Sequence, residues 1–241
     1  WDDDDWYPPE RLSRQVYALS VERGDVVGSS RLFFLQAEQE RAWEYCYGGT
    51  GKAWVAGSTM VYRRDFWKRN PFQERQIGED TTFVWSSVVE RVTDMKDSSL
   101  CIAFVHKGNC SPKRPDSNFW KPVDTAVVQQ LMKAAGMIEN KSENSELKAL
   151  RRPGLSVVIP HGGDVRLPQL AASLANLAQC KEIDEIIIVE LGIVAYARRV
   201  AFRWSARYVF ARHEGPFVRA RALNIGTAIA AFELVMWKDG D

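Results

Sequence analysis

The chain has 241 residues, of which 46% are hydrophobic, and its 32 basic and 31 acidic residues leave a formal net charge of +1. This length suits one large domain or two small ones, and the apolar share is sufficient for a sizeable core. The balanced charge gives no reason to expect wholesale nucleic-acid or membrane binding, and no apolar run has the length of a transmembrane segment.

The four cysteines, at positions 46, 101, 110 and 180, form no CxxC pair and have no zinc-ligand spacing. This pattern predicts reduced thiols in a cytosolic-type protein, with one disulfide as the alternative. No signal peptide opens the chain, but the first residue is not methionine. We therefore expect the chain to be a piece of a longer protein.

The first twelve residues, WDDDDWYPPERL, place four consecutive aspartates between two tryptophans. Acidic runs are usually solvated tails, but tails are poor in aromatic residues, and Trp1, Trp6 and Tyr7 surround this one. Clustered carboxylates become favourable when a divalent cation neutralises them, and magnesium and manganese prefer oxygen ligands. The run is therefore a candidate cation site.

The first half of the chain predicts a mixture of helices and strands. Leu12, Val16 and Leu19 recur at helical spacing in the first helix. Glu79 and Asp80 stand at the start of another helix, where acids favour the positive end of the dipole. The expected order is a helix over 8–22, a strand and an apolar run over 25–35, a glycine-rich stretch ending as a strand and helix over 47–67, a helix over 77–92, a strand and polar loop over 99–111, and a helix over 121–136.

The polar stretch 140–153 is the best linker candidate, and the pattern changes after it. Buried strands are predicted at 155–160, 184–192 and 234–241, with helices at 165–180 and 221–233. Alternating strands and helices predict a parallel α/β sheet, in which ligands bind outside the carboxyl ends of the strands. The DGD sequence of 239–241 follows such an end, although an Asp-Gly turn is the simpler reading.

Several of these stretches together resemble family 2 glycosyltransferases, which have the GT-A fold. LSVVIP, DEIIIVELG, RARALNIGTAIA and VMWKDGD are similar to the donor-binding half, and WDDDDWYPPERLSRQV, WVAGSTMVYRRDFW, IGEDTTFV and FVHKGNCS to the other half. The resemblance implies an α/β fold with a Rossmann-like, mostly parallel sheet flanked by helices. Residues 1–139 would be the acceptor and catalytic half, and 154–241 the nucleotide-sugar half.

The halves stand in the reverse of the family's order. Either the chain spans two tandem modules, or its halves pair as a circular permutant. The resemblance implies a metal-dependent, inverting transfer from a nucleotide-diphosphate sugar, with a UDP-sugar favoured and Mn²⁺ or Mg²⁺ as cofactor. The acceptor would be a glycan or lipid-linked hydroxyl, in the cytoplasm or at a membrane that holds the acceptor. The alternatives are a non-catalytic nucleotide- or carbohydrate-binding fragment and a nucleotidyltransferase.

The resemblance also implies roles for particular residues. Asp80 would be the general base, with Glu79 as second choice, and a helix N-cap is the structural alternative for Asp80. The acceptor would lie at Trp54, Gly57 and Ser58, with Trp67 and Trp120 as further stacking rings unless they pack in the core. The nucleotide-binding set is Pro160, His161, Glu190, Arg219, Arg221 and Asn224. The metal-binding set is Asp2, Asp4, Asp5, His106, Asp239 and Asp241, and a hydrogen-bonded histidine at a strand end is the alternative for His106.

Overall fold

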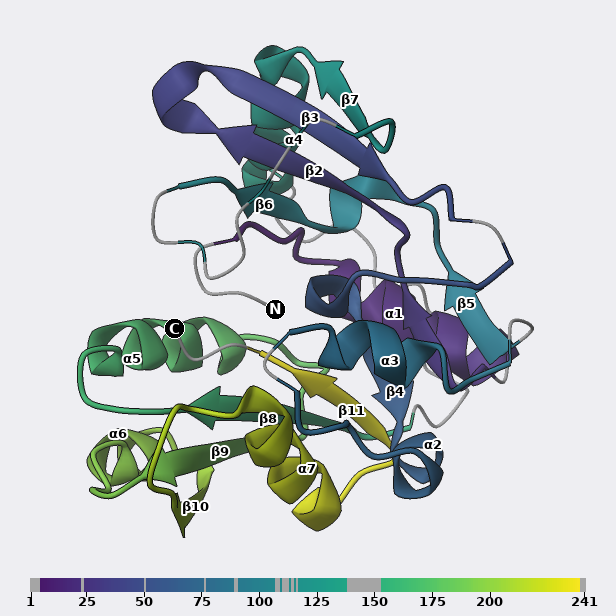
Figure 1. The fold of residues 1–241 in the computed structure, drawn as a ribbon. Coiled ribbons are helices and arrows are strands. Elements are labelled where there is room, and N and C mark those ends of the chain that lie inside the picture. The colour runs from purple at the N-terminus through teal and green to yellow at the C-terminus, as the bar shows by residue number, and fades with distance from the viewer. Residues whose placement is uncertain are drawn as a thin grey trace.

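The computed structural model describes residues 5–22, 24–49, 51–75, 77–88, 91–106, 109, 113, 115, 117–137 and 153–238. These residues form an α/β structure with a larger and a smaller sheet (Figure 1). The predicted α/β class is therefore confirmed, and the larger sheet is mixed.

The larger sheet has seven strands in the order β10-β9-β8-β11-β4-β1-β5. All neighbouring strands are parallel except at β4, which is antiparallel to both β11 and β1. The segments before and after the linker candidate 140–153 both contribute strands to this sheet. Strand β4 of the first segment pairs with β11 of the second. The strands are β1 (Val26–Gly28), β4 (Val61–Arg63), β5 (Val92–Asp94), β8 (Leu155–His161), β9 (Glu185–Gly192), β10 (Arg207–Arg212) and β11 (Leu234–Trp237).

Helices cover both faces of this sheet because its strand residues alternate between two hydrophobic clusters. On one face, Val157 and Ile159 pack with α1 (Arg11–Glu22), α5 (Leu167–Leu177) and α6 (Arg198–Arg203). On the other face, Val158 packs with α2 (Arg64–Arg69), α3 (Glu79–Val84) and α7 (Arg219–Ile229).

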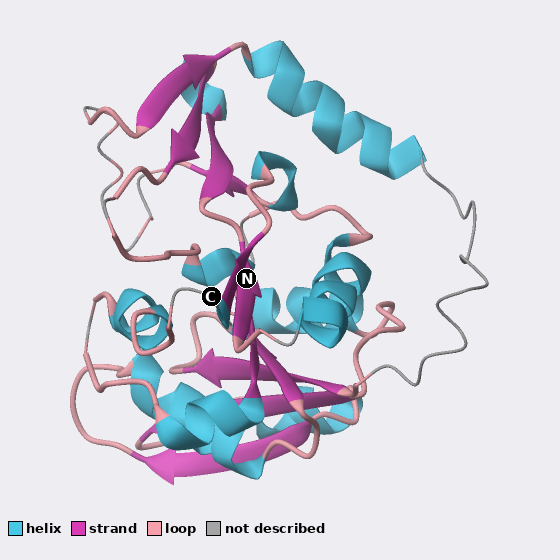
Figure 2. Cartoon of the chain, turned by 90° about the vertical axis from the view of Figure 1, so that its right-hand side faces the viewer, coloured by secondary structure: helices cyan, strands magenta, loops and turns pink. Residues whose placement is uncertain are grey.

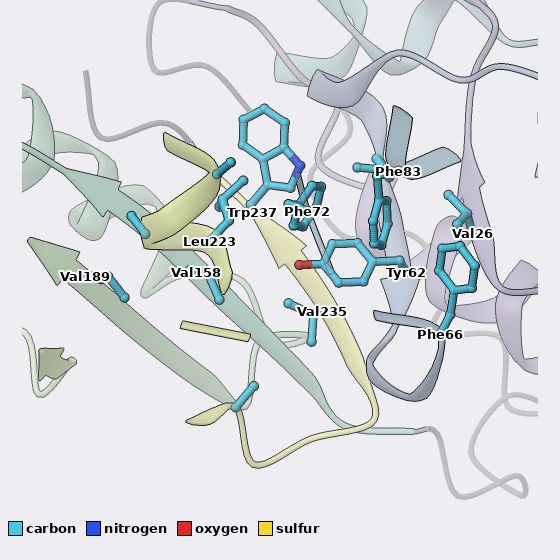
Figure 3. Close-up of a cluster of buried hydrophobic side chains, with 14 of the residues drawn as sticks. Val26, Tyr62, Phe66, Phe72, Phe83, Val158, Val189, Leu223, Val235 and Trp237 are labelled. Carbon is cyan, nitrogen blue, oxygen red and sulfur yellow. The ribbon is translucent and has the colours of Figure 1, made fainter. Parts of the chain in front are cut away.

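Side chains from the two sequence segments meet around Tyr62 in the second of these clusters (Figure 3). The Tyr62 hydroxyl is 2.9 Å from Thr227 Oγ1 of α7. Burial raises the pKa of Tyr62 above its ordinary value. The two segments therefore share one core.

The smaller sheet has the order β6-β2-β3-β7, and α4 (Thr125–Met137) lies along one of its faces (Figure 2). Val128 of α4 packs there against Leu35, Ala42 and Ile102. The opposite face is rich in aromatic rings and packs on Ala56. The strands are β2 (Arg31–Gln36), β3 (Arg41–Cys46), β6 (Ile102–Phe104) and β7 (Trp120–Val123), and the short helical turns are η1 (Ala37–Gln39), η2 (Gly57–Thr59) and η4 (Ser98–Leu100).

Two predicted helices differ from the observed elements. The helix expected over 77–92 ends at Val84, where Ser86 N and Ser87 N bond three residues back and tighten the last turn. Val92 then begins β5. The helix expected over 121–136 starts only at Thr125, because the preceding residues pair with β3 as strand β7.

The cysteine prediction agrees with the structure where the residues are described. Cys46, Cys101 and Cys180 are reduced thiols, and Cys110 lies outside the described residues. Burial raises the pKa of Cys46 and of Cys180, which keeps both sulfurs protonated to higher pH.

Candidate functional site

The candidate site lies at the carboxyl edge of the larger sheet, where the parallel strands β1, β8 and β11 end. Ser29 follows β1, donates its backbone N–H to Thr59 Oγ1 at 2.9 Å, and accepts at its carbonyl from Ala56 N at 2.9 Å. These bonds hold the η2 turn directly over the end of β1. In open α/β sheets this edge is where ligands bind.

Gly57 of η2 and Asp80 of α3, two residues predicted for the site, are in direct contact. A Cβ atom added at Gly57 would lie 2.5 Å from Asp80 Oδ2 and 3.0 Å from Asp80 Cβ. Only glycine therefore leaves room for the Asp80 carboxylate in this position. The predicted acceptor site and the predicted base are thus brought together.

Asp80 is not the N-cap of its helix, so that alternative is wrong. The N-cap is Gly78, whose φ of 80° is typical of glycine and which has no capping side chain. Asp80 is the second residue of the helix and is half-buried. Its Oδ1 accepts a hydrogen bond from Thr81 N at 2.6 Å.

Trp54 lies next to the same helix turn. Its Nε1 donates to Thr81 Oγ1 at 3.1 Å, and its ring lies 5.8 Å from that of Tyr45 and 5.1 Å from that of Tyr47. The three half-buried rings form an aromatic wall that reaches α3 through Trp54, and Tyr45 and Trp54 belong to the aromatic cluster of the smaller sheet. An aromatic wall of this kind suits an apolar or sugar-ring face.

Residues of the second segment reach the site through Arg219 at the start of α7. The Arg219 guanidinium lies 4.8 Å from the ring centroid of Trp237, the last residue of β11. Its Nε donates to Glu79 Oε1 at 2.7 Å, and Glu79 is only 1% exposed. Asp80 follows Glu79 directly, so the ion pair fixes where its helix begins.

A clamp that the sequence analysis missed holds the η2 turn from α1. Arg11 Nη2 donates to the Ser58 carbonyl at 2.7 Å and Arg11 Nε donates to Gln15 Oε1 at 2.9 Å. Gln15 Nε2 donates in turn to the Thr59 carbonyl. Burial lowers the pKa of Arg11. Interactions with Tyr7, Cys101 and Asp5 raise the pKa and so offset part of this effect. The available signal was two polar residues spaced i, i+4 beside the apolar stripe of that helix.

Of the predicted metal ligands, only Asp5 and His106 are described, and Asp2, Asp4, Asp239 and Asp241 lie outside the described residues. Asp5 Oδ1 accepts from Phe104 N at 2.9 Å, which ties the N-terminal segment to β6. His106 is exposed, and together with Glu38 it lines a hollow of about 410 Å³. Asp80 does not line this hollow. The described part of the chain holds no group of three metal-ligating side chains. The metal therefore stays a prediction.

Pro160 and His161 end β8, and His161 is paired in register with Glu190 of β9. His161 is 2% exposed, and its Nε2 lies 2.9 Å from the Gly163 carbonyl. Glu190 is fully buried and accepts from Tyr196 N, Ala197 N and the Tyr208 hydroxyl. Burial, and then the bond to Glu190, raises the pKa of Tyr208. Glu190 thus orders the loop between β9 and α6.

Asn224 of α7 is bound within the protein. Its Oδ1 accepts from Trp67 Nε1 at 3.0 Å and Phe72 N at 2.9 Å, and its Nδ2 donates to the Phe72 carbonyl at 2.7 Å. Asn224 therefore ties α7 to the segment after α2, and Trp67 packs against the core there. Arg221 Nη1 lies 3.3 Å from His213 Nδ1.

Ser58 and Trp120 complete the predicted residues. Ser58 Oγ lies 3.8 Å from Cys101 Sγ. The Ser58 hydroxyl is therefore at the contact between η2 and the smaller sheet. Trp120 packs in the aromatic cluster, with its ring 4.5 Å from that of Phe34. The structure therefore brings Trp54, Gly57, Ser58, Glu79, Asp80 and Arg219 to one edge.

Comparisons of the chain with family models, curated proteins and solved structures found no match. Within the described ranges, every helix is too short or too polar to cross a bilayer. The residues gathered around Asp80 therefore carry the functional assignment.

Proposed function

We propose that the chain is an inverting glycosyltransferase that moves a sugar from a nucleotide-diphosphate sugar to a hydroxyl of a glycan or lipid-linked acceptor. The observation that carries this proposal is the contact between Asp80 and Gly57. A half-buried carboxylate lies against bare backbone at the carboxyl edge of the sheet, beside the ring of Trp54.

In the proposed reaction the acceptor hydroxyl binds next to the Asp80 carboxylate that lies over Gly57, and it gives its proton to Asp80. The hydroxyl oxygen forms a bond to the anomeric carbon as the carbon–oxygen bond to the diphosphate breaks. The nucleoside diphosphate leaves with the electron pair of the broken bond, and the configuration at the anomeric carbon inverts. A positioned carboxylate contributes roughly 10²- to 10⁴-fold to such a proton transfer.

The donor diphosphate would lie at the start of α7. Arg219 and Arg221 occupy the first turn of this helix, where cations oppose the dipole. Glu79 already neutralises part of this charge at Arg219, and a bound anion would be attracted further by the helix N-terminus and by the arginine forks. Arg219 is one-third exposed, with 33% of its side-chain surface accessible, so a ligand can reach it.

The proposed requirement for Mn²⁺ or Mg²⁺ rests on the aspartates at the two ends of the sequence. A bound divalent ion would neutralise the leaving diphosphate as a Lewis acid. Of these aspartates only Asp5 is described, and its carboxylate accepts a hydrogen bond from Phe104 N of β6. No step of the reaction is assigned to the metal.

The test combines binding with turnover. UDP, GDP, CDP and dTDP are titrated calorimetrically with and without Mn²⁺, and the matching nucleotide sugars are then assayed for diphosphate release with simple glycosides as acceptors. We expect one nucleotide to bind only with Mn²⁺. The Asp80→Asn variant should keep that binding and lose turnover by roughly 10²- to 10⁴-fold.

Asp65→Asn is the matched control, since Asp65 is an exposed carboxylate on α2 whose side chain is 76% accessible. It should bind and turn over as the unmodified protein does. The proposal fails if no nucleotide in the panel binds, or if Asp80→Asn turns over at the rate of Asp65→Asn.

A further inference from the structure

The outer face of α6 carries an exposed phenylalanine among arginines. Phe202 is 87% exposed, while Ala197 and Ala201 on the inner side of the helix are fully buried. Arg198, Arg199 and Arg203 are also exposed. Arg198 and Arg199 stand at i−4 and i−3 from Phe202 and so neighbour it on the helix surface, and Arg203 follows it directly in the sequence.

The sequence around α6 carries one sign of charge. Residues 191–213 contain five arginines and no aspartate or glutamate. Arg207 pairs with Glu185 and Arg212 with Glu214. None of the ion pairs found within the described ranges involves an arginine of α6.

The loop that leads from β9 into α6 also carries exposed apolar side chains. Ile193 is 69% exposed and Val194 is 46% exposed. Bare aliphatic side chains gain nothing from the phosphate backbone of a nucleic acid, but they gain from entering the acyl boundary of a bilayer. Arginines around them are then at the level of the headgroups, where they attract anionic lipids.

We infer that Phe202, with Ile193 and Val194, and the arginines of α6 dock the protein on the surface of an anionic phospholipid bilayer. The apolar side chains enter the boundary between headgroups and acyl chains, and Arg198, Arg199 and Arg203 bind lipid phosphates. The β9–α6 loop lies at the carboxyl edge of the sheet, and α6 lies on the face opposite α3 and α7.

The test is flotation of the whole chain with vesicles of phosphatidylcholine alone or mixed equally with phosphatidylglycerol. We expect binding to the mixed vesicles only, weakened by added salt. Phe202→Ser should weaken it roughly tenfold, since the phenyl ring is no longer buried at the interface. Arg199→Gln/Arg203→Gln should weaken it by more than tenfold, at roughly fivefold per arginine.

Two control variants separate this surface from general effects, and circular dichroism verifies that each variant is folded. Val127→Ser removes an exposed apolar side chain from α4, and Arg31→Gln/Arg41→Gln removes two exposed arginines from the smaller sheet. Both should bind like the unmodified protein. The inference is overturned if mixed vesicles do not bind the protein, or if the α6 variants match their controls. It is also overturned if the arginine pair matters while Phe202→Ser does not, since a single-stranded oligonucleotide would then be the better partner.

Discussion

Glu79 of α3 and Arg219 of α7 form an ion pair across 140 residues of sequence, with Arg219 Nε 2.7 Å from Glu79 Oε1. Glu79 is 1% exposed, and its Oε2 has no hydrogen-bond partner among the described residues. A buried carboxylate is costly without a counter-charge. The pair therefore couples the start of α3, which carries Asp80, to the segment that contains α7.

Removing one partner of this pair should be strongly destabilising. We expect Arg219→Ala to lower the free energy of unfolding by roughly 3 kcal/mol, because the Glu79 carboxylate is left buried and uncompensated. The double variant Glu79→Gln/Arg219→Ala should recover part of the loss. Arg212→Ala is the control, since its partner Glu214 is 70% exposed, and it should cost at most about 1 kcal/mol. Urea denaturation measures all three, and equal losses for the two arginines would contradict the proposed coupling.

Gly57→Ala should displace Asp80, because the new Cβ would lie 2.5 Å from Asp80 Oδ2. We expect a stability loss of roughly 1–3 kcal/mol from the overpacking and a loss of turnover of roughly 10²-fold from the misplaced carboxylate. At Gly192 the nearest atom to an added Cβ is 3.7 Å away, so Gly192→Ala should change neither quantity. Urea denaturation and diphosphate release measure the two effects, and full turnover in the Gly57→Ala variant would show that the contact has no functional role.

Asn224 can be tested for a structural role separately from nucleotide binding. In Asn224→Asp the group that donates to the Phe72 carbonyl is lost and a carboxylate faces that oxygen. We expect a loss of roughly 1–3 kcal/mol in the free energy of unfolding, with a change in the fluorescence of the neighbouring Trp67. Asn176→Asp, at an exposed position on α5, should be nearly neutral. Unchanged stability combined with lost nucleotide binding would instead favour the ligand role.

Asp97 should make stability depend on pH in the acid range. Burial raises its pKa, but bonds from Ser99 and Arg14 more than offset this, so the pKa lies below the ordinary value of 3.8. A carboxylate with a depressed folded-state pKa contributes stability above about pH 4. This stability is lost as the pH falls through the folded-state pKa. Asp97→Asn should cost roughly 1 kcal/mol at pH 7, because the charged partner of Arg14 and the charge-assisted bonds from Ser99 are lost, and progressively less below pH 4.

The comparison for that prediction is Arg14→Gln, which removes one partner of the carboxylate, 2.6 Å away, and leaves the bonds from Ser99. It should show the same trend with a smaller amplitude. Urea denaturation between pH 3 and pH 7 measures both variants, on the usual scale for carboxylate titration. A stability difference for Asp97→Asn that grows toward low pH would reverse the expected sign.

Several elements followed from local pattern alone. The strands β8 and β9 and the helices α1 and α5 were predicted close to their observed bounds, since their apolar residues repeat with the period of a buried strand or an amphipathic helix. The strands β3 and β10 were not predicted. β3 mixes charged and aromatic residues, and β10 carries an arginine at each end, so neither shows a strong period.

The candidate site was predicted as a set of residues but not as a geometry. Asp80, Gly57 and Trp54 were identified from motifs, and the structure brings them together. Glu190 and Asn224 were also identified, and their polar atoms are bound within the protein. A motif names the residue type, whereas hydrogen-bond satisfaction depends on neighbours distant in sequence.

The sequence by itself determined the α/β class and most strong helices and strands, because these depend on periods that span only a few residues. Only the tertiary structure decided that β4 lies antiparallel between β11 and β1, and thus that both segments share one sheet. Strand order depends on long-range packing of side chains such as Tyr62, and no local period encodes it. The buried position of Arg11 also depends on tertiary structure, because its guanidinium donates to the Ser58 carbonyl of the η2 turn.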